Sequence, residues 1–504
     1  MEVHMNMISF LLFMSFLFLL IQKWRKSKTL LPPGPWRLPI IGSVHHLTSG
    51  LPHRVLKNLS QKYGPIMYLQ LGEVPTVVVS SAHMAKQILK THDLAFASRP
   101  ETMMGKIICY NCKDIAFSPY GDYWRHMRKL TVLELLSAKM VKSFSPIGRD
   151  ELSSLLSSVG SMDLDLSINL AEKLLWFMNA ATCRSAFGTV CKDQTELIKL
   201  IHQAQSLSGG FELADLFPSR KFLHGLSGME SKLMKARNKI DAVLDNIINV
   251  QRESHTNGRS CNGESGVEDL VDVFIRVMER GSFPVSLTND NIKAVILDMF
   301  VAGSDTSSSM VIWALSEMMK SPSVMAKAQA EAREVFKRKK TCDDDTDILK
   351  LNYLKLVIKE TLSLHPPTPL LVLRERREET QIDGFTIPLK SKVMVNVWAI
   401  GRDPESWEDP ECFIPERFEK NSFEFTGNHF QFLPFGTGTR ICPGIQFGLA
   451  LITLPLAHLL YNFDWKLPEG INARDLDMTE ANGIATRRQN DLYLIATPYV
   501  SPLD

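Results

Sequence analysis

The fold of this chain is decided by Phe435-Gly436-Thr437-Gly438-Thr439-Arg440-Ile441-Cys442-Pro443-Gly444, which delivers a cysteine into the apolar run 445–463. The glycines let the backbone close around the sulfur of Cys442. Backbone N–H groups and the positive end of the following helix are expected to stabilise a thiolate there. No histidine or asparagine is spaced as in known cysteine hydrolases, so this thiolate is better suited to bind a metal than to act as a nucleophile. Taken alone, the stretch also fits a plain loop followed by a helix.

Composition and charge describe a globular chain the size of an enzyme. Of its 504 residues 45% are hydrophobic and 22% are charged, and the glycines and prolines show no period, which excludes disordered, collagen-like and low-complexity classes. A net charge of +2 gives no reason to expect a nucleic-acid partner. The 8 cysteines are scattered, as in a protein with reduced thiols. The lone pair Cys109 and Cys112 lacks the second pair that a zinc site needs.

The cysteine turn matches the signature FxxGxRxCxG, and through it the chain resembles the cytochrome P450 family. The resemblance implies a mainly α fold with a minor β region, in which haem b lies between a long central helix and the cysteine loop. It implies that Cys442 is the axial ligand of the haem iron and that Phe435, Arg440 and Gly444 shape the loop that holds the cofactor. A thiolate ligand pushes electron density onto the iron and favours cleavage of the O–O bond, which suits monooxygenation.

Residues 287–321 predict the long central helix. Thr288, Asn289 and Asp290 are candidate N-caps, Pro322 lies beyond the far end, and the length corresponds to roughly 50 Å.

The middle of this helix reads Ala302-Gly303-Ser304-Asp305-Thr306. Glycine and hydroxyl side chains weaken a helix locally and predict a kink or a widened turn, although a solvated polar face is the alternative. The cluster resembles the family pattern AGxDT/S. The resemblance implies that Thr306 hydrogen-bonds dioxygen and ordered water beside the haem, and that Asp305 helps to relay protons.

Trp124 and Arg128 are four residues apart in Trp124-Arg125-His126-Met127-Arg128-Lys129, so they lie on one face of a helix. Alone, this is only a basic amphipathic helix. The segment matches the family pattern WRxxRK, which implies that Trp124 and Arg128 hold a haem propionate. Arg374 and Arg440 occupy the other positions expected to pair with propionates. Arginine suits this role because its planar guanidinium donates two parallel hydrogen bonds to a carboxylate.

One segment departs from the family pattern. The helix 353–365 should contain ExxR, whose glutamate and arginine join the arginine of a downstream PERF segment, but it reads Glu360-Thr361-Leu362-Ser363. The structural pair Glu360 and Arg417 is still available, whereas the middle cation is missing. Removing one member of a buried charged network typically costs several kcal/mol. We therefore expect the chain to incorporate haem less well than a Ser363→Arg version.

The N-terminus carries the features of a membrane anchor. Residues 8–21 are apolar apart from two serines, 5–7 extend the run, and 22–28 are largely basic. About 17 residues give about 25 Å, near the lower limit for spanning the endoplasmic reticulum bilayer. The basic cluster follows the run without a small-residue cleavage site, which indicates a retained anchor and not a signal peptide; a buried core helix is the weaker alternative. Positive-inside bias leaves the remaining chain in the cytosol.

These features divide the chain into an N-terminal membrane anchor, a stiff proline-rich hinge and a cytochrome P450 catalytic domain, at residues 1–28, 29–42 and 43–504. The expected location is the endoplasmic reticulum membrane, with a single span. Within the catalytic domain 64–72 and 75–80 predict two strands joined by a turn, 385–397 predicts a hairpin, and 491–497 predicts C-terminal β structure. Apolar residues at three- and four-residue spacing make the bulk helical.

Several local sequences resemble the plant A-type (clan 71, microsomal) group, among them Lys359-Glu360-Thr361-Leu362, His365-Pro366-Pro367 and Phe432-Leu433-Pro434-Phe435-Gly436. Within this group the chain is most similar to members that oxidise terpenoid hydrocarbons, including casbene-type diterpenes. This resemblance implies a substrate pocket whose residues are mostly apolar, namely Leu297, Val301, Ala302, Thr368, Leu370, Leu371 and Ile484. A phenolic or fatty-acid substrate is an alternative.

The implied activity is that of a haem-thiolate monooxygenase acting on an apolar plant specialised metabolite. Its electrons would come singly from NADPH-cytochrome P450 reductase, so that NADPH contributes only through this partner, and cytochrome b5 is a second candidate partner. A haem-thiolate isomerase or dehydratase is an alternative, against which the presence of Asp305 and Thr306 argues. A catalytically impaired haem-binding protein is a further alternative, because Ser363 replaces the expected arginine.

Overall fold

The computed structural model describes residues 14, 30–163, 166–188, 194–206, 212–220, 222, 228–256, 269–281, 283–337, 345–420, 423–483 and 485–500. The predicted anchor, apart from Met14, and the predicted pocket residue Ile484 lie outside these residues. Among the described residues, α14 (Asn289–Lys320) and α19 (Ile445–Asn462) have the length and composition of membrane spans, and both are at least half buried inside the folded body.

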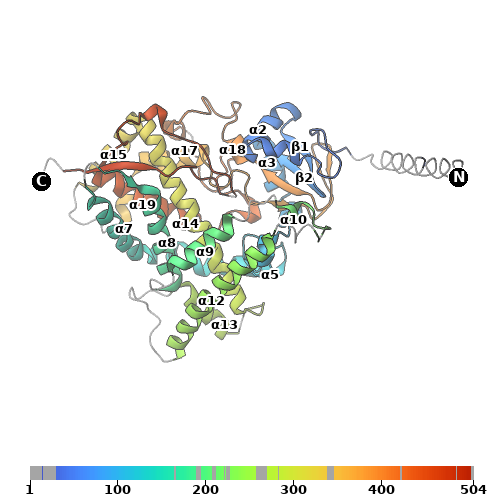
Figure 1. Cartoon of the computed structure of the whole chain (residues 1–504), viewed down its shortest axis with the longest axis horizontal. Helices are drawn as coiled ribbons and strands as arrows, with labels where there is room; N and C mark the ends of the chain where they lie inside the picture. Colours follow the sequence, from blue (N-terminus) through green and yellow to red (C-terminus); the bar gives the residue numbers. More distant parts are fainter. Residues whose placement is uncertain are drawn as a thin grey trace.

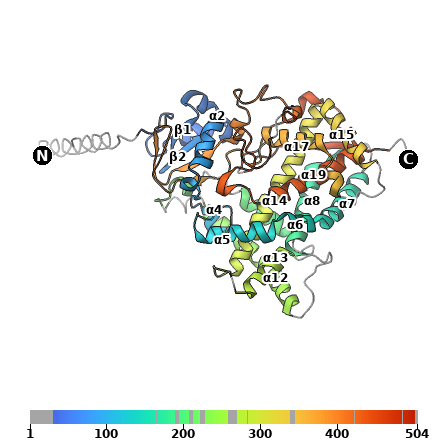
Figure 2. The ribbon, with the colours of Figure 1, turned by 180° about the vertical axis from the view of Figure 1, so that it is seen from behind.

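Helices make up most of the body, and α14 crosses its middle (Figure 1). Figure 2 shows α5, α6 and α7 along the opposite side of the body, with α12 and α13 below them in this view. The other α-helices are α2 (Pro52–Tyr63), α3 (Ala82–Lys86), α4 (Met103–Ile107), α5 (Asp122–Leu130), α6 (Ala138–Ser143), α7 (Ser145–Gly160), α8 (Leu170–Phe187), α9 (Gln194–Ser206), α10 (Leu213–Leu216), α12 (Met229–Thr256), α13 (Leu270–Glu279), α15 (Pro322–Phe336), α16 (Asp345–Ile348), α17 (Asn352–Leu364) and α18 (Val397–Ile400).

The ends of α14 agree with the capping signals in the sequence. Thr288 and Asn291 form a capping box, in which the Thr288 backbone N–H donates to Asn291 Oδ1 at 2.7 Å. The helix ends at Lys320, and Pro322 occupies the first turn of α15.

The centre of α14 differs from the expectation of a kink or a widened turn. Residues 302–306 stay α-helical, and the Thr306 hydroxyl donates back to the carbonyl of Ala302. Ser304 Oγ contacts Thr182 Oγ1 of α8 at 3.3 Å, so packing against the neighbouring helix supports this turn. The hydroxyl groups are therefore accommodated without a break in the helix.

Within the described residues the strands form three small sheets. The strands β1 and β2 lie on the side of the body that is to the right in Figure 1. The largest sheet has the order β1-β2-β7-β4, and the others have the orders β3-β9-β8 and β5-β6. The strands are β1 (Ile66–Leu71), β2 (Val74–Val79), β3 (Ile168–Asn169), β4 (Arg374–Glu375), β5 (Thr380–Ile382), β6 (Phe385–Ile387), β7 (Lys392–Val395), β8 (Phe463–Lys466) and β9 (Tyr493–Pro498). The predicted β1–β2 hairpin and C-terminal strand are confirmed.

The hairpin predicted at 385–397 is wrong. Its strand β6 pairs with β5, whereas β7 pairs in parallel with β2, with Thr76 opposite Lys392 and Val79 opposite Val395. β2 and β7 are rich in valine and largely buried. Their valine side chains pack in one core, although the two strands are far apart in the sequence. Tertiary packing therefore overrides the local hairpin.

The proline-rich segment is docked onto β1. The Tyr68 N–H donates to the Pro33 carbonyl at 2.9 Å, and the Gly72 N–H donates to the Ile41 carbonyl at 3.1 Å. At Gly42, where φ is 63°, an added Cβ would lie 2.1 Å from the Gln70 carbonyl oxygen. Only glycine permits this approach, so the segment meets the catalytic body in a defined position.

Candidate functional site

The loop around Cys442 is shaped by its glycines and by Asp93. Gly438 has φ 71°, and a Cβ there would lie 2.3 Å from the Leu89 carbonyl oxygen. Asp93 Oδ2 accepts from both the backbone N–H and the hydroxyl of Thr439 at 2.6 Å. The Cys442 N–H donates to the Phe435 carbonyl at 3.0 Å, which closes the loop behind the sulfur. Sequence reasoning missed Asp93, which lies more than 340 positions from the loop.

The electrostatics of Cys442 correct one expectation. Burial raises the pKa of the Cys442 thiol, although the Gly444 backbone N–H and the Arg128 guanidinium both act to lower it. Desolvation of the charged form outweighs these two interactions. The protein alone therefore does not favour the thiolate, and a bound metal cation would be needed to complete the deprotonation.

The central helix α14 crosses the start of α19 directly beside this loop. An added Cβ on Gly303 would lie 3.5 Å from the Phe447 ring, and one on Gly448 would lie 3.9 Å from Ser307 Oγ. Small residues therefore permit close approach of the two helices. Ala302 is exposed and Thr306 is partly exposed in the middle of an otherwise buried helix. The structure thus brings the predicted α14 cluster, including Asp305, to the same region as the cysteine loop.

The residues predicted to hold the haem propionates also come together. The Arg440 guanidinium lies 4.0 Å from the centre of the Trp124 ring and donates to the carbonyls of Ala97, Ile115 and Ser118. Arg374 pairs with Asp93 at 2.6 Å and donates to the Thr437 carbonyl at 2.8 Å. Arg128 donates to the Ile441 carbonyl, next to the cysteine. Backbone carbonyls therefore hold all three guanidinium groups in place.

A fourth guanidinium, that of Arg99, belongs to the same cluster and was missed from the sequence. It is buried and donates to the carbonyls of Ala116, Val372 and Leu373. Burial and repulsion from Arg440, Arg374 and Arg128 lower the pKa of Arg99, and burial and repulsion lower that of Arg440 to about 9. A cluster of buried cations that repel one another is suited to bind a ligand with carboxylates. These cations and the single sulfur donor in a glycine-lined loop fit haem b.

Glu360 of α17 forms the expected ion pair with Arg417 of the segment Pro415–Phe418. Arg417 Nε lies 3.1 Å from Glu360 Oε1, which also accepts from the Ile414 N–H at 2.9 Å. Glu360 Oε2 is buried and has no donor among the residues that the structure describes. Burial raises the pKa of Glu360 to about 7, because Arg417 only partly offsets the desolvation. Ser363, buried on the same helix where the family pattern has arginine, carries no positive charge to pair with this oxygen.

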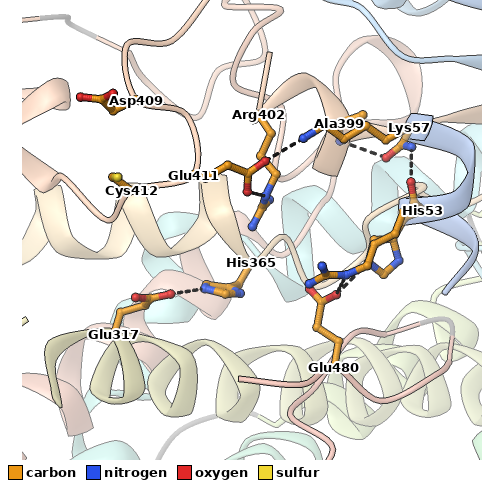
Figure 3. A network of polar contacts seen from close by, with 12 residues as sticks. His53, Lys57, Glu317, His365, Ala399, Arg402, Asp409, Glu411, Cys412 and Glu480 are labelled. Carbon is orange, nitrogen blue, oxygen red and sulfur yellow. Dashed lines mark hydrogen bonds and ion pairs between the residues drawn. The ribbon is translucent and has the colours of Figure 1, made fainter. Parts of the chain in front are cut away.

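A polar network that sequence reasoning missed lies near the end of α17 (Figure 3). His365 Nε2 lies 2.7 Å from Glu317 Oε1 of α14, and its ring stacks on Trp313 at 4.1 Å. Three further ion pairs join His53 and Arg54 to Glu480, at 2.9 and 2.7 Å, and Arg402 to Glu411 at 2.9 Å. These cations engage other carboxylates and none of them donates to Glu360 Oε2.

A cavity of about 1020 Å³, including its open mouth, is lined by the start of α4, by residues of α10 and α12, and by the segments 369–373 and 481–483. Its lining is mainly apolar and includes Met104, Phe117, Leu370, Leu371 and Asn482. Two of the predicted pocket residues, Leu370 and Leu371, therefore line this cavity.

The other described pocket residues are placed differently. Leu297 is buried in the main core, Val301 packs against that core and Ala302 is exposed on α14. Thr368 precedes the cavity-lining run 369–373.

Comparison with known proteins gives one consistent result. The family model "Cytochrome P450" matches residues 32–495. The chain is 57% identical over 497 residues to premnaspirodiene oxygenase from Hyoscyamus muticus, covering 98% of each chain. It is also 57% identical over 498 residues to 5-epiaristolochene 1,3-dihydroxylase from Nicotiana tabacum, again covering 98% of each chain.

The fold has solved counterparts as well. A structure of a zebra fish cytochrome P450 with progesterone matches with a TM-score of 0.75, covers 89% of this chain and 99% of its own, and shares 24% sequence identity. The cysteine loop, the central helix, the arginine cluster and these similarities agree, and the chain belongs to the cytochrome P450 family as a monooxygenase.

Proposed function

We propose that this protein inserts one oxygen atom of O2 into a terpenoid hydrocarbon. One atom enters a C–H bond and the other leaves as water, and two electrons and two protons balance the reaction. The observation that carries this proposal is that the middle of α14, with Ala302 exposed and Thr306 partly exposed, packs against the start of α19 directly after the Cys442 loop. The mainly apolar cavity described above would receive the substrate. When bound, haem b supplies the iron chemistry that activates dioxygen.

The chain's own residues have distinct roles in this proposal. Cys442 would hold the iron, and Arg128, Arg374 and Arg440 would hold the propionates together with Trp124. Thr306 would orient a hydroxyl beside the substrate, and Asp305 would deliver protons to that hydroxyl. The apolar cavity walls would exclude water and orient a substrate that has few polar groups.

The substrate we propose is a sesquiterpene hydrocarbon. The names of the two relatives above contain premnaspirodiene and 5-epiaristolochene, and both compounds are sesquiterpenes. Neither name supports the casbene-type diterpene that we expected from the sequence. The proposed substrate is therefore of the smaller class.

The electron donor and the location are further parts of the proposal. We infer an NADPH-cytochrome P450 reductase as the donor, with cytochrome b5 as a second partner, because two electrons must be supplied singly. The apolar run 8–21 followed by basic residues supports an anchor at 1–28 in the endoplasmic reticulum membrane, followed by the segment 29–42 and a cytosolic catalytic domain from 43 to 504.

The test is a turnover assay with purified protein, reductase and NADPH. Premnaspirodiene, 5-epiaristolochene, casbene, a fatty acid and a simple phenol are supplied separately, and products are identified by mass spectrometry. We expect an alcohol from a sesquiterpene, formed in proportion to NADPH consumed and absent with a Cys442→Ser variant. Turnover without NADPH would favour an isomerase, and exclusive oxidation of the fatty acid or the phenol would refute the terpenoid assignment.

A further inference from the structure

The cavity-wall segment, residues 109–118, contains a strained turn. Tyr110, Asn111 and Cys112 have φ values of 53°, 60° and 57°. Three consecutive residues with side chains in the left-handed region are costly, at about 1–2 kcal/mol each. Such a turn persists only where surrounding contacts hold it. The segment also supplies Phe117 to the cavity, so whatever holds it shapes the cavity wall.

Helix α12 and the first turns of α14 hold one end of the segment. The Tyr110 hydroxyl donates to Asp241 Oδ1 at 2.9 Å, and the Arg237 guanidinium stacks 3.5 Å from the Tyr110 ring centre. Lys113 pairs with Asp290 of α14 at 2.7 Å. These contacts fix the turn but do not reach the residues nearest the cavity.

The other end is held by a carboxyl group of α14. Asp298 Oδ2 accepts from the backbone N–H groups of Ile115 and Ala116, at 2.7 and 3.3 Å. The Ile115 carbonyl accepts from Trp124 Nε1 at 3.1 Å and from Arg440 Nη1 at 3.2 Å. Ile115 therefore links the cavity wall both to α14 and to the side chains that we propose hold the propionates.

A second carboxyl group lies beside the first. Asp114 is fully buried, and its Oδ2 accepts from the Phe117 N–H at 2.9 Å. Among the described residues, no donor makes a well-formed hydrogen bond to its buried Oδ1, and the Cys109 thiol and the Asp298 carboxyl are the side chains close enough to interact with this carboxyl. The Asp114 and Asp298 carboxyls are nevertheless close enough to hydrogen-bond to each other. Two carboxylates have no hydrogen to donate, so this contact requires a proton on one of them.

The shifts in pKa agree with a proton on Asp114. Burial raises the pKa of Asp114 well above its usual range and raises that of Asp298 to about 6. The hydrogen bond between the two groups acts to raise the pKa of Asp114 and to lower that of Asp298, as expected when Asp114 donates. The titratable and charged groups that face Asp114 are Cys109, Cys112, Tyr123, Arg99 and Arg440, and the first three of these are neutral at pH 7.

We propose that Asp114 and Asp298 share one proton and together act as a positioning pair that holds the cavity-wall segment against α14. Asp298 holds the backbone of Ile115 and Ala116, Asp114 holds that of Phe117, and the shared proton joins the two. The pair thereby keeps Phe117 in place at the cavity. Only the statement that this cavity receives the substrate rests on the proposed function.

The proton is tested directly by infrared spectroscopy of the full-length, haem-loaded protein at pH 7. The spectrum of the unchanged protein minus that of Asp114→Asn should show the C=O stretch of a protonated carboxylic acid. Asp290→Asn is the matched control, because it removes a carboxyl from α14, the helix that carries Asp298, and this carboxyl is paired with Lys113 and partly exposed to solvent. The control should leave this band in place. Absence of the band from the Asp114→Asn difference spectrum would overturn the proposal.

The positioning role is tested by hydrogen exchange of a peptide that spans residues 109–118. Asp298→Ala removes the acceptor of two backbone N–H groups and should speed exchange by about tenfold or more. Asp298→Asn keeps an acceptor oxygen and should exchange nearly as slowly as the unchanged protein, as should Asp290→Asn. Equal exchange in Asp298→Ala and the unchanged protein would contradict the role. If Asp298→Ala fails to fold, the infrared measurement on Asp114→Asn still decides the proton, and Asp114→Ala, which removes the acceptor of the Phe117 N–H, should speed exchange of the same peptide.

A spectral titration with premnaspirodiene completes the test. We expect weaker binding in Asp298→Ala than in Asp298→Asn, measured as the shift of the haem absorption band. If the proposed substrate class is wrong, premnaspirodiene will bind to none of the proteins, while the infrared and exchange results will be unaffected. Failure of the proposed function is thus distinguishable from failure of the positioning pair.

Discussion

Replacing Ser363 by arginine should stabilise this protein, and should do so increasingly as the pH rises. The structure supplies a buried acceptor for the new guanidinium, because Glu360 Oε2 has no donor among the described residues. The Glu360 side chain is only 1% exposed, and it forms an ion pair with Arg417 Nε. A second cation would favour the charged carboxylate and lower its pKa.

The magnitude follows from the pKa of Glu360, which burial raises from 4.5 to about 7. A carboxyl with a raised pKa binds more protons in the folded state, so stability falls as the pH rises from 4.5 through about 7. At about 1.4 kcal/mol for each pH unit, the full penalty is about 3 kcal/mol above pH 7. Ser363→Arg should recover up to this amount at pH 8 and almost none at pH 4.5.

The assay is unfolding in urea at pH 5 and pH 8, together with the haem content per protein after identical expression. Ser363→Met is the matched control, because it adds a long side chain without a charge. We expect Ser363→Arg, but not Ser363→Met, to gain stability at pH 8 and to carry more haem. Equal haem content in Ser363→Arg and the unchanged protein, or equal gains in the two variants, would refute the reasoning.

Three other predictions concern the site and its surroundings. Cys442→Ser should abolish the absorption band of a thiolate-ligated haem in the reduced protein with carbon monoxide, because a hydroxyl is a poor ligand; an unchanged band would exclude Cys442 as the ligand. In Arg440→Lys, the lysine cannot make the three hydrogen bonds to carbonyls that the guanidinium makes. Haem should therefore transfer from this variant to apomyoglobin about tenfold faster or more, measured by absorbance. An unchanged transfer rate would contradict a role of Arg440 in holding the haem. His53 and Arg54 lower the pKa of Glu480 to about 2, so the stabilising contribution of this carboxylate is present above pH 4.5 and lost between pH 4.5 and 2. Glu480→Gln should lower the free energy of unfolding at pH 7, measured in urea, by up to about 3 kcal/mol and make that free energy depend less on pH below 4.5. A variant as stable as the unchanged protein would show that the ion pairs of Glu480 do not stabilise the fold.

The sequence by itself determined the elements whose causes are local. Glycines at fixed offsets around Cys442 predict a loop that closes around the sulfur, and capping residues and periodicity predict the helix of residues 289–320 to within two residues at its start and one at its end. The alternating and valine-rich runs predict β1 and β2 with a short turn between them. Backbone conformation and helical faces depend on neighbouring residues, which the sequence shows directly.

Only the tertiary structure decided which charges meet and which strands pair. Arg99 joins the arginine cluster, Asp114 lies beside Asp298, and β7 pairs with β2, through contacts between residues far apart in the chain. The direction in which the pKa of Cys442 shifts likewise depends on how completely the whole fold excludes water from the sulfur. Desolvation and long-range packing are sums over the folded molecule, and no local pattern of residues contains them.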